Sequence, residues 1–120
     1  MSSVEPQPYT RLTGCPTQFF TLCIVRSVKT GKFLAVEEVR NKGWWLPGGF
    51  VEPGDDVFQT AHKEAKEEAD MELKLKGFLR FDCTLTKFKG RARAVFYAEP
   101  LDEDHPPKSI ADAESVSAKW

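Results

Sequence analysis

The sequence predicts a single α+β domain with a mixed β-sheet, and three observations support this. The chain has 120 residues, which is the length of one domain rather than two. One run with helical periodicity, Asp56 to Ala69, lies between segments that are rich in strand-forming residues. Two longer predicted strands and one short strand precede this helix, and two strands follow it. Residues 1–16 are polar with scattered prolines, so we expect a loose N-terminal arm there.

The first half of the chain predicts three strands. β-Branched and aromatic residues dominate Gln18 to Val28, which predicts a central strand buried on both faces. Phe33 to Val39 is predicted to return beside it as the second strand of a hairpin. Trp44 to Leu46 predicts a short strand. Because side chains alternate along a strand, we expect one of Trp44 and Trp45 to face the core and the other a cleft, where it could stack on a base or sugar. The alternative is a purely structural role, with one ring in the core and the other partly exposed.

The predicted helix carries an unusual concentration of glutamates. Its apolar stripe is formed by Val57, Ala61 and Ala65. Glu64 and Glu68 project at the edge of this buried stripe, and Glu67 lies a little further round the helix. Carboxylates at this spacing repel one another, and unpaired buried charges are costly. A divalent cation bound between them would remove both problems, whereas a solvated acidic helix face is the alternative.

The segment after the helix predicts a second hairpin, made of Glu72 to Phe88 and Arg91 to Glu99. Arg80, Arg91 and Arg93 lie in this hairpin. They are candidate substrate-binding residues, because guanidinium groups form paired hydrogen bonds with phosphate oxygens. A solvated strand face is the alternative explanation for these arginines.

The stretch from Gly49 to Met71 joins a glycine-rich loop to the acidic helix, and it resembles the signature known as the Nudix box. That signature is a glycine, five residues, a glutamate, seven residues, an Arg-Glu step, two residues, a Glu-Glu pair, one further residue and a final glycine. Lys63-Glu64 corresponds to the Arg-Glu step, and Glu67-Glu68 corresponds to the pair. The spacing is kept without a gap. The resemblance covers residues 18–120, and the box is its specific part.

Three positions depart from the signature. Asp55 stands where the family has a glutamate, Lys63 where it has an arginine, and Asp70 where it has the final glycine. In the family the arginine helps to orient the glutamates, and lysine lacks its planar fork of donors. Asp55 and Lys63 are a matched change if they form an ion pair. At Asp70, aspartate accepts a left-handed helix end less well than glycine does.

The resemblance implies an α/β/α sandwich with a mixed sheet, here apparently without its C-terminal helix. It also implies a Nudix-type pyrophosphohydrolase that uses Mg²⁺ or Mn²⁺ to cleave a diphosphate linkage in a nucleoside diphosphate attached to another moiety X. The expected metal ligands are Glu64, Glu67 and Glu68, with the carbonyl of Gly49. The departures favour an alternative, a catalytically weak or inactive nucleotide-binding module. A third hypothesis is an ordinary interaction domain that matches the box by accident.

The catalytic base is expected among the same glutamates or at Glu114. Glu114 stands six residues before Trp120, a spacing similar to that of an additional metal ligand or base in the family. The catalytic candidates are therefore Glu64, Glu67, Glu68 and Glu114. The residues do not indicate which of them accepts the proton.

Composition limits the partners and the compartment. The chain has 17 Lys and Arg against 18 Asp and Glu, so no basic excess indicates a nucleic-acid polymer, and a small phosphorylated molecule is the expected partner. Cys15, Cys23 and Cys83 form no zinc or disulfide pattern, which favours a reducing, cytoplasmic location. We expect no membrane segment. A sheet face without its covering helix would favour self-association, so a homodimer is a further expectation.

Overall fold

A computed structural model describes residues 8, 10 and 14–120 of the chain, so most of the predicted N-terminal arm lies outside the described residues. The described part has one helix, α1, set among seven strands. In chain order the elements are β1 (Thr17–Val25), β2 (Ala35–Glu37), β3 (Trp44–Trp45), β4 (Gly48–Phe50), α1 (Val57–Ala69), β5 (Leu73–Leu85), β6 (Gly90–Pro100) and β7 (Ser117–Lys119). The helix is neither long nor apolar enough to cross a membrane.

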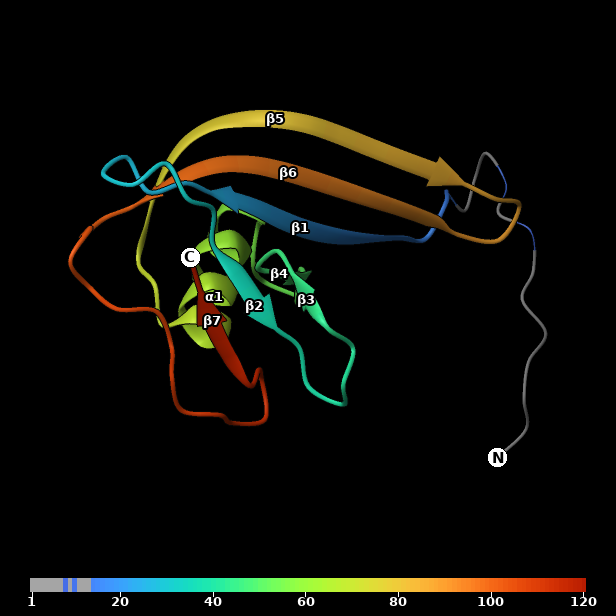
Figure 1. The fold of residues 1–120 in the computed structure, drawn as a ribbon. Coiled ribbons are helices and arrows are strands. Elements are labelled where there is room, and N and C mark those ends of the chain that lie inside the picture. Colours follow the sequence, from blue (N-terminus) through green and yellow to red (C-terminus); the bar gives the residue numbers. More distant parts are fainter. Residues whose placement is uncertain (1–7, 9, 11–13) are drawn as a thin grey trace.

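The strands form two sheets, and α1 lies beside both (Figure 1). The larger sheet has the order β4-β1-β6-β5 and is mixed, because β1 pairs with β6 in parallel and the other pairs are antiparallel. The smaller sheet has the order β3-β2-β7 and is antiparallel. The predicted mixed sheet and single helix are therefore present. β1 is a central strand, as predicted, although its first residues are partly exposed.

The predicted hairpin of the first two strands is wrong, because β2 belongs to the smaller sheet. Only an isolated bridge between Arg26 and Phe33 joins the two segments. The place beside β1 is taken by β4, which belongs to the segment that we interpreted as a loop. Gly48 makes this possible, since a Cβ there would lie 2.2 Å from the carbonyl oxygen of Thr21.

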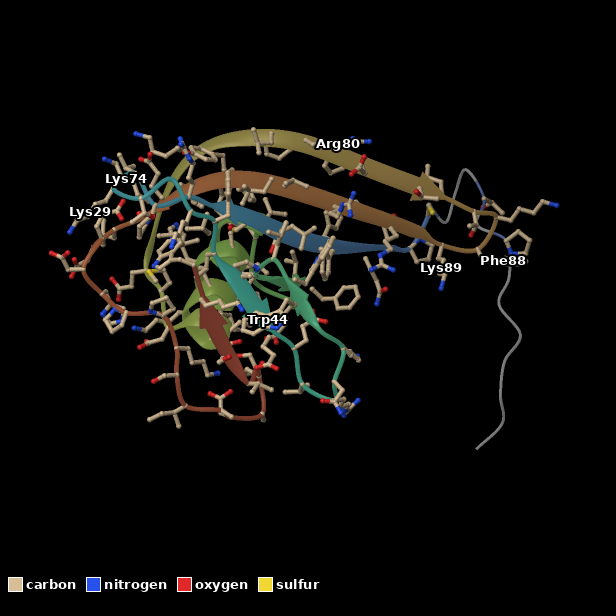
Figure 2. All side chains as sticks on the ribbon, in the orientation of Figure 1. Lys29, Trp44, Lys74, Arg80, Phe88 and Lys89 are labelled. Atoms are coloured by element: carbon tan, nitrogen blue, oxygen red, sulfur yellow. The ribbon has the colours of Figure 1, made fainter. Side chains whose placement is uncertain are left out.

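The second predicted hairpin is confirmed. β5 and β6 pair from Leu73 opposite Pro100 to Leu85 opposite Gly90, with two irregularities in β5. The far halves of these strands extend with β1 beyond the helix (Figure 1). Phe88 marks the tip of the hairpin, at the opposite end from Lys74 (Figure 2).

The helix is held in place by small side chains and by its first cap. Thr60, Ala61, Ala65 and Ala69 are buried on its inner face. These small residues let the helix backbone lie close to the strands, and the core around them is shared by both sheets. Its members are Cys23, Val25, Leu34, Val36, Ala61, Ala65, Ala69, Met71, Leu73, Ala94, Phe96, Ala98 and Ala118. Asp56 accepts a hydrogen bond from the Gln59 N–H, and the Gln59 side chain accepts one from the Asp56 N–H, which completes a capping box.

Candidate functional site

Two adjacent glycines bring the β4 backbone against the glutamates of α1. A Cβ on Gly49 would lie 2.5 to 2.8 Å from the carboxyl atoms of Glu64, so no larger residue fits there without moving this side chain. One turn further along, Oε1 of Glu68 accepts a hydrogen bond of 2.9 Å from the Gly48 N–H. Both carboxylates are half-buried. The sequence therefore correctly placed these two side chains on the inner edge of the helix.

Burial makes Glu64 a weaker acid than an ordinary glutamate. Its pKa is raised to about 7, chiefly because burial disfavours the charged form. The charges of Glu67 and Glu114 raise this pKa further, whereas nearby Lys63 lowers it. The structure thus brings Glu67 and Glu114 within electrostatic reach of Glu64.

Glu68 is perturbed even more strongly. Burial raises its pKa to about 8, and the hydrogen bond from Gly48 offsets only part of this effect. The charges of Glu64, Glu38 and Glu114 raise the pKa as well. Glu38 is not among the residues predicted for this site, because no local sequence pattern marks it. Its position depends on β2 pairing in the smaller sheet rather than with β1, and this pairing is decided by residues far apart in the sequence.

The cluster has the donor chemistry for a hard cation, but its side chains are not gathered around one point. Within residues 8, 10 and 14–120, no three His, Cys, Asp or Glu side chains lie close enough together to hold an ion as they stand. Carboxylate and carbonyl oxygens are nevertheless the ligands that Mg²⁺ and Mn²⁺ prefer. The described residues also contain one buried side-chain polar atom without a hydrogen-bond partner, Oγ1 of Thr21. Thr21 pairs with Gly49 across β1 and β4, so this orphaned oxygen belongs to the same corner of the fold.

The departures from the signature are accommodated by ion pairs. Nζ of Lys63 lies 3.0 Å from Oε2 of Glu52 and 3.7 Å from Oδ2 of Asp55. The expected contact between Lys63 and Asp55 is therefore present, but Glu52 is the closer partner. Asp70 ends the helix in the left-handed region, with φ of 51°. Its side chain lies 3.2 Å from Lys66, and this contact lowers the pKa of Asp70.

A cleft of about 600 Å³ opens over residues of the larger sheet and of the segment from Glu38 to Trp45. Its lining residues are Phe20, Leu22, Glu38, Trp45, Asp82, Thr84, Arg91 and Arg93. Glu38 connects this cleft with the glutamates of α1, because it lines the cleft and its charge also raises the pKa of Glu68. Aromatic and cationic side chains on one wall can stack on a ring and contact phosphate oxygens.

The two tryptophans differ from the expectation that one would face the core. Trp44 is 41% exposed and Trp45 is 54% exposed. The reason is that β3 is a two-residue strand at the edge of the smaller sheet, so it has too few neighbours to bury either ring. Trp45 lines the cleft, whereas the ring of Trp44 lies 4.3 Å from Nζ of Lys119. Of the two, only Trp45 is placed to stack on a ligand in this cleft.

The three arginines have different surroundings. The guanidinium carbon of Arg91 lies 5.7 Å from the ring centres of both Phe20 and Phe50. Arg93 donates to Oδ2 of Asp82 at 2.8 Å. Arg80 does not line the cleft; it projects from the edge strand β5 (Figure 2) and donates to the other oxygen of Asp82 at 2.7 Å. The structure therefore brings Arg91 and Arg93 into the cleft and leaves Arg80 outside it.

Comparison with known proteins agrees with this geometry. A family model described as the NUDIX domain matches residues 18–120. The human 8-oxo-dGDP phosphatase NUDT18 is 30% identical over 90 residues, which are 72% of this chain and 27% of the relative. The asymmetrical bis(5′-nucleosyl)-tetraphosphatase of Caenorhabditis elegans is 40% identical over 57 residues, which are 45% of this chain and 41% of the relative. The chain thus spans about a quarter of the length of NUDT18.

Solved structures share the fold. The MutT protein of Methanosarcina mazei Go1 superposes with a TM-score of 0.66 at 21% identity, over 88% of this chain and 77% of that protein. A UDP-X diphosphatase superposes with a TM-score of 0.69 at 22% identity, over 88% of this chain and 50% of the other. This likeness confirms the predicted α/β/α class with a mixed sheet. The described residues contain one helix of this sandwich, α1.

Proposed function

Because the chain belongs to the Nudix family, we propose that it is a pyrophosphohydrolase that cleaves a diphosphate linkage in a nucleoside diphosphate attached to another moiety. The observation that carries this proposal is the pair of half-buried glutamates against the Gly48–Gly49 backbone. Glu64 and Glu68 have raised pKa values, and among the described residues neither forms an ion pair with a cationic side chain. Such carboxylates are poised to gain from a bound cation.

Mg²⁺ or Mn²⁺ is the proposed cofactor. Glu64, Glu67 and Glu68, with the carbonyl of Gly49, would hold it, since all four provide hard oxygen ligands. When bound, the cation supplies positive charge against the phosphate oxygens and lowers the pKa of water. The glutamate side chains would have to come closer together to share one ion, because among the described residues they are not gathered around one point.

The protein's own residues would then perform proton transfer. One of the three helix glutamates, or Glu114, accepts a proton from the attacking water. The pKa values of Glu64 and Glu68, about 7 and 8, belong to the metal-free protein, and a bound divalent cation would lower both of them. Glu114 is exposed, and its charge acts on both of them.

The cleft is the proposed substrate site. Arg91 and Arg93 would bind phosphate oxygens, and Trp45 would stack on a base or sugar. The names of the related proteins indicate nucleoside diphosphates and dinucleoside polyphosphates as substrates of those enzymes. A net charge of −1 agrees with a small ligand better than with a nucleic-acid polymer. The homodimer and the cytoplasmic location stay predictions.

A hydrolysis panel tests the proposal. Nucleoside diphosphates, nucleoside triphosphates, nucleoside diphosphate sugars and dinucleoside polyphosphates are incubated with the protein, with and without Mg²⁺, and mass spectrometry identifies the products. The proposal expects cleavage of a diphosphate linkage that requires the cation. Stabilisation by a nucleotide without turnover would instead indicate a binding module. The absence of any response to Mg²⁺ or nucleotide would contradict both hypotheses.

A further inference from the structure

The carbonyl groups at the end of α1 are held by a segment that lies far along the chain. An α-helix leaves its last carbonyl oxygens without partners from its own backbone. The segment 108–115 satisfies three of them, at the residues that carry or follow the site glutamates. The bonds run from Lys108 Nζ to Glu67 O at 3.0 Å, from Ser115 Oγ to Glu68 O at 2.6 Å, and from the Lys108 N–H to Ala69 O at 2.9 Å.

Lys108 is the centre of this arrangement. It is only 7% exposed, which is rare for a lysine. Its ammonium group has three donors, and all three are used. Besides Glu67 O, they reach Oδ1 of Asp112 at 2.6 Å and Oγ of Ser115 at 2.8 Å. A buried ammonium group is costly unless it is paired and fully hydrogen-bonded, and here it is both.

The same group of hydrogen bonds around Lys108, Asp112 and Ser115 also holds the backbone of Glu114. Oδ1 of Asp112 also accepts hydrogen bonds from the N–H groups of Glu114 at 2.8 Å and of Ser115 at 3.3 Å. This one oxygen of Asp112 therefore joins the ammonium group of Lys108 to the backbone of Glu114. The turn that carries Glu67 and Glu68 and the loop that carries Glu114 are fixed to each other through this oxygen.

Ending the helix does not require these hydrogen bonds around Lys108. Asp70 already adopts the left-handed conformation that stops a helix, and the Met71 N–H bonds Ala65 O at 3.2 Å. The cap at Asp70 therefore already ends the helix, and a buried lysine with all of its donors in use is not needed for that purpose. Its distinctive effect is on the distance between the helix glutamates and Glu114.

We propose that Lys108, with Asp112 and Ser115, is a positioning group that holds the helix turn of Glu67 and Glu68 beside the loop of Glu114, so that these carboxylates can together bind the cation and act on the substrate. This inference rests on the proposed function. A group of this kind does not contact the substrate itself. Loss of a hydrogen-bonding partner behind a metal ligand reduces metal affinity or activity by roughly 10 to 100-fold.

The test compares three variants of the whole chain. Lys108→Met keeps much of the side-chain volume and removes the charge and the donors. Ser115→Ala removes one hydroxyl group, and it keeps the question answerable if the first variant does not fold. Lys66→Met is the matched control, because Lys66 is an exposed lysine on the same helix whose ion pairs are with Asp70 and Glu72.

Each protein is assayed well below its melting temperature for kcat, KM, and the Mg²⁺ concentration that gives half of the rise in melting temperature. For Lys108→Met we expect kcat to fall by roughly 10 to 100-fold, the Mg²⁺ midpoint to rise by a similar factor, and KM to stay within about threefold. Ser115→Ala should show the same pattern more weakly, and Lys66→Met should match the wild type.

Two failures can be told apart. If the wild type hydrolyses its substrate but the folded Lys108 and Ser115 variants lose only thermal stability, with kcat and the Mg²⁺ midpoint unchanged, the positioning role is wrong. If the wild type itself shows neither turnover nor a response to Mg²⁺, the proposed function fails and the positioning role fails with it.

Discussion

Replacing Glu68 with glutamine should stabilise the protein when no divalent cation is present. Glutamine has nearly the same shape, and its side-chain oxygen can still accept the hydrogen bond from the Gly48 N–H. The substitution removes only the charge. Because burial raises the pKa of Glu68 to about 8, the folded protein disfavours the charged form of this side chain. Removing that charge therefore removes a penalty from the folded state.

The sign and the size of the effect follow from this pKa. The folded-state pKa of Glu68 lies above its ordinary value of 4.5, so its contribution to stability is fully present below pH 4.5 and is lost as the pH rises towards 8. One pKa unit corresponds to about 1.4 kcal/mol. Glu68 is only half-buried, so solvent screening makes the penalty smaller than the whole pKa shift would give. We expect a penalty of roughly 2 kcal/mol in the free energy of unfolding at pH 8. For a domain of this size, that is a rise in Tm of roughly 8 °C.

The assay is a set of melting curves in EDTA at pH 5, 6.5 and 8. Wild type is compared with Glu68→Gln and with Glu72→Gln, an exposed glutamate beyond the helix that serves as the control. The gain of Glu68→Gln should be small at pH 5 and largest at pH 8, and the control should show none. Excess Mg²⁺ should reverse the order at pH 8, because the wild type alone gains free energy from binding. A Glu68→Gln protein that melts below the wild type in EDTA at pH 8 would refute the reasoning.

Three further predictions concern catalysis. Glu64→Gln should nearly abolish Mg²⁺-dependent hydrolysis and leave the circular dichroism spectrum unchanged; an active variant would remove Glu64 from the site. Lys63→Arg should raise kcat by a few-fold, because arginine orients carboxylates with a fork of donors, and its effect should not add to that of Asp55→Glu since the two side chains are in contact. Additive or absent effects in that kinetic cycle would show that the departures are neutral. Arg91→Ala should raise KM by about tenfold if the residue binds phosphate, whereas Arg80→Ala, outside the cleft, should change it little; equal effects would contradict the assignment of the cleft.

The helix and its glutamates could be predicted because their signals are local. The 3.6-residue period places Ala61 and Ala65 in the core, and the same period places Glu64 and Glu68 at its edge. The second hairpin was also predictable, since β5 and β6 are joined by a short turn. In each case the residues that determine the structure are neighbours in the sequence.

The errors arose where distant segments decide the structure. β2 follows β1 closely, yet it pairs with β3 and β7 because β4 and β6 take both sides of β1. Nothing within Phe33 to Val39 encodes that competition. Glu38 and the burial of Lys108 escaped prediction for the same reason, since their partners come from other parts of the chain. The short edge strand β3 left both tryptophans exposed, although alternation predicted one inward ring.

The parallel pairing of β1 with β6 has a consequence for how the chain acquires its structure. It joins Thr17 to Gly90 and Val25 to Ala98, so the two strands at the centre of the sheet come from opposite ends of the sequence. Closing so long a loop loses chain entropy before any contact compensates for it, whereas α1 and the β5–β6 hairpin form from neighbouring residues. During synthesis, β1 emerges from the ribosome long before its partner exists. We therefore expect the centre of the sheet to be the slow step of refolding, and stopped-flow tryptophan fluorescence with variants in β1 and in the hairpin would measure it.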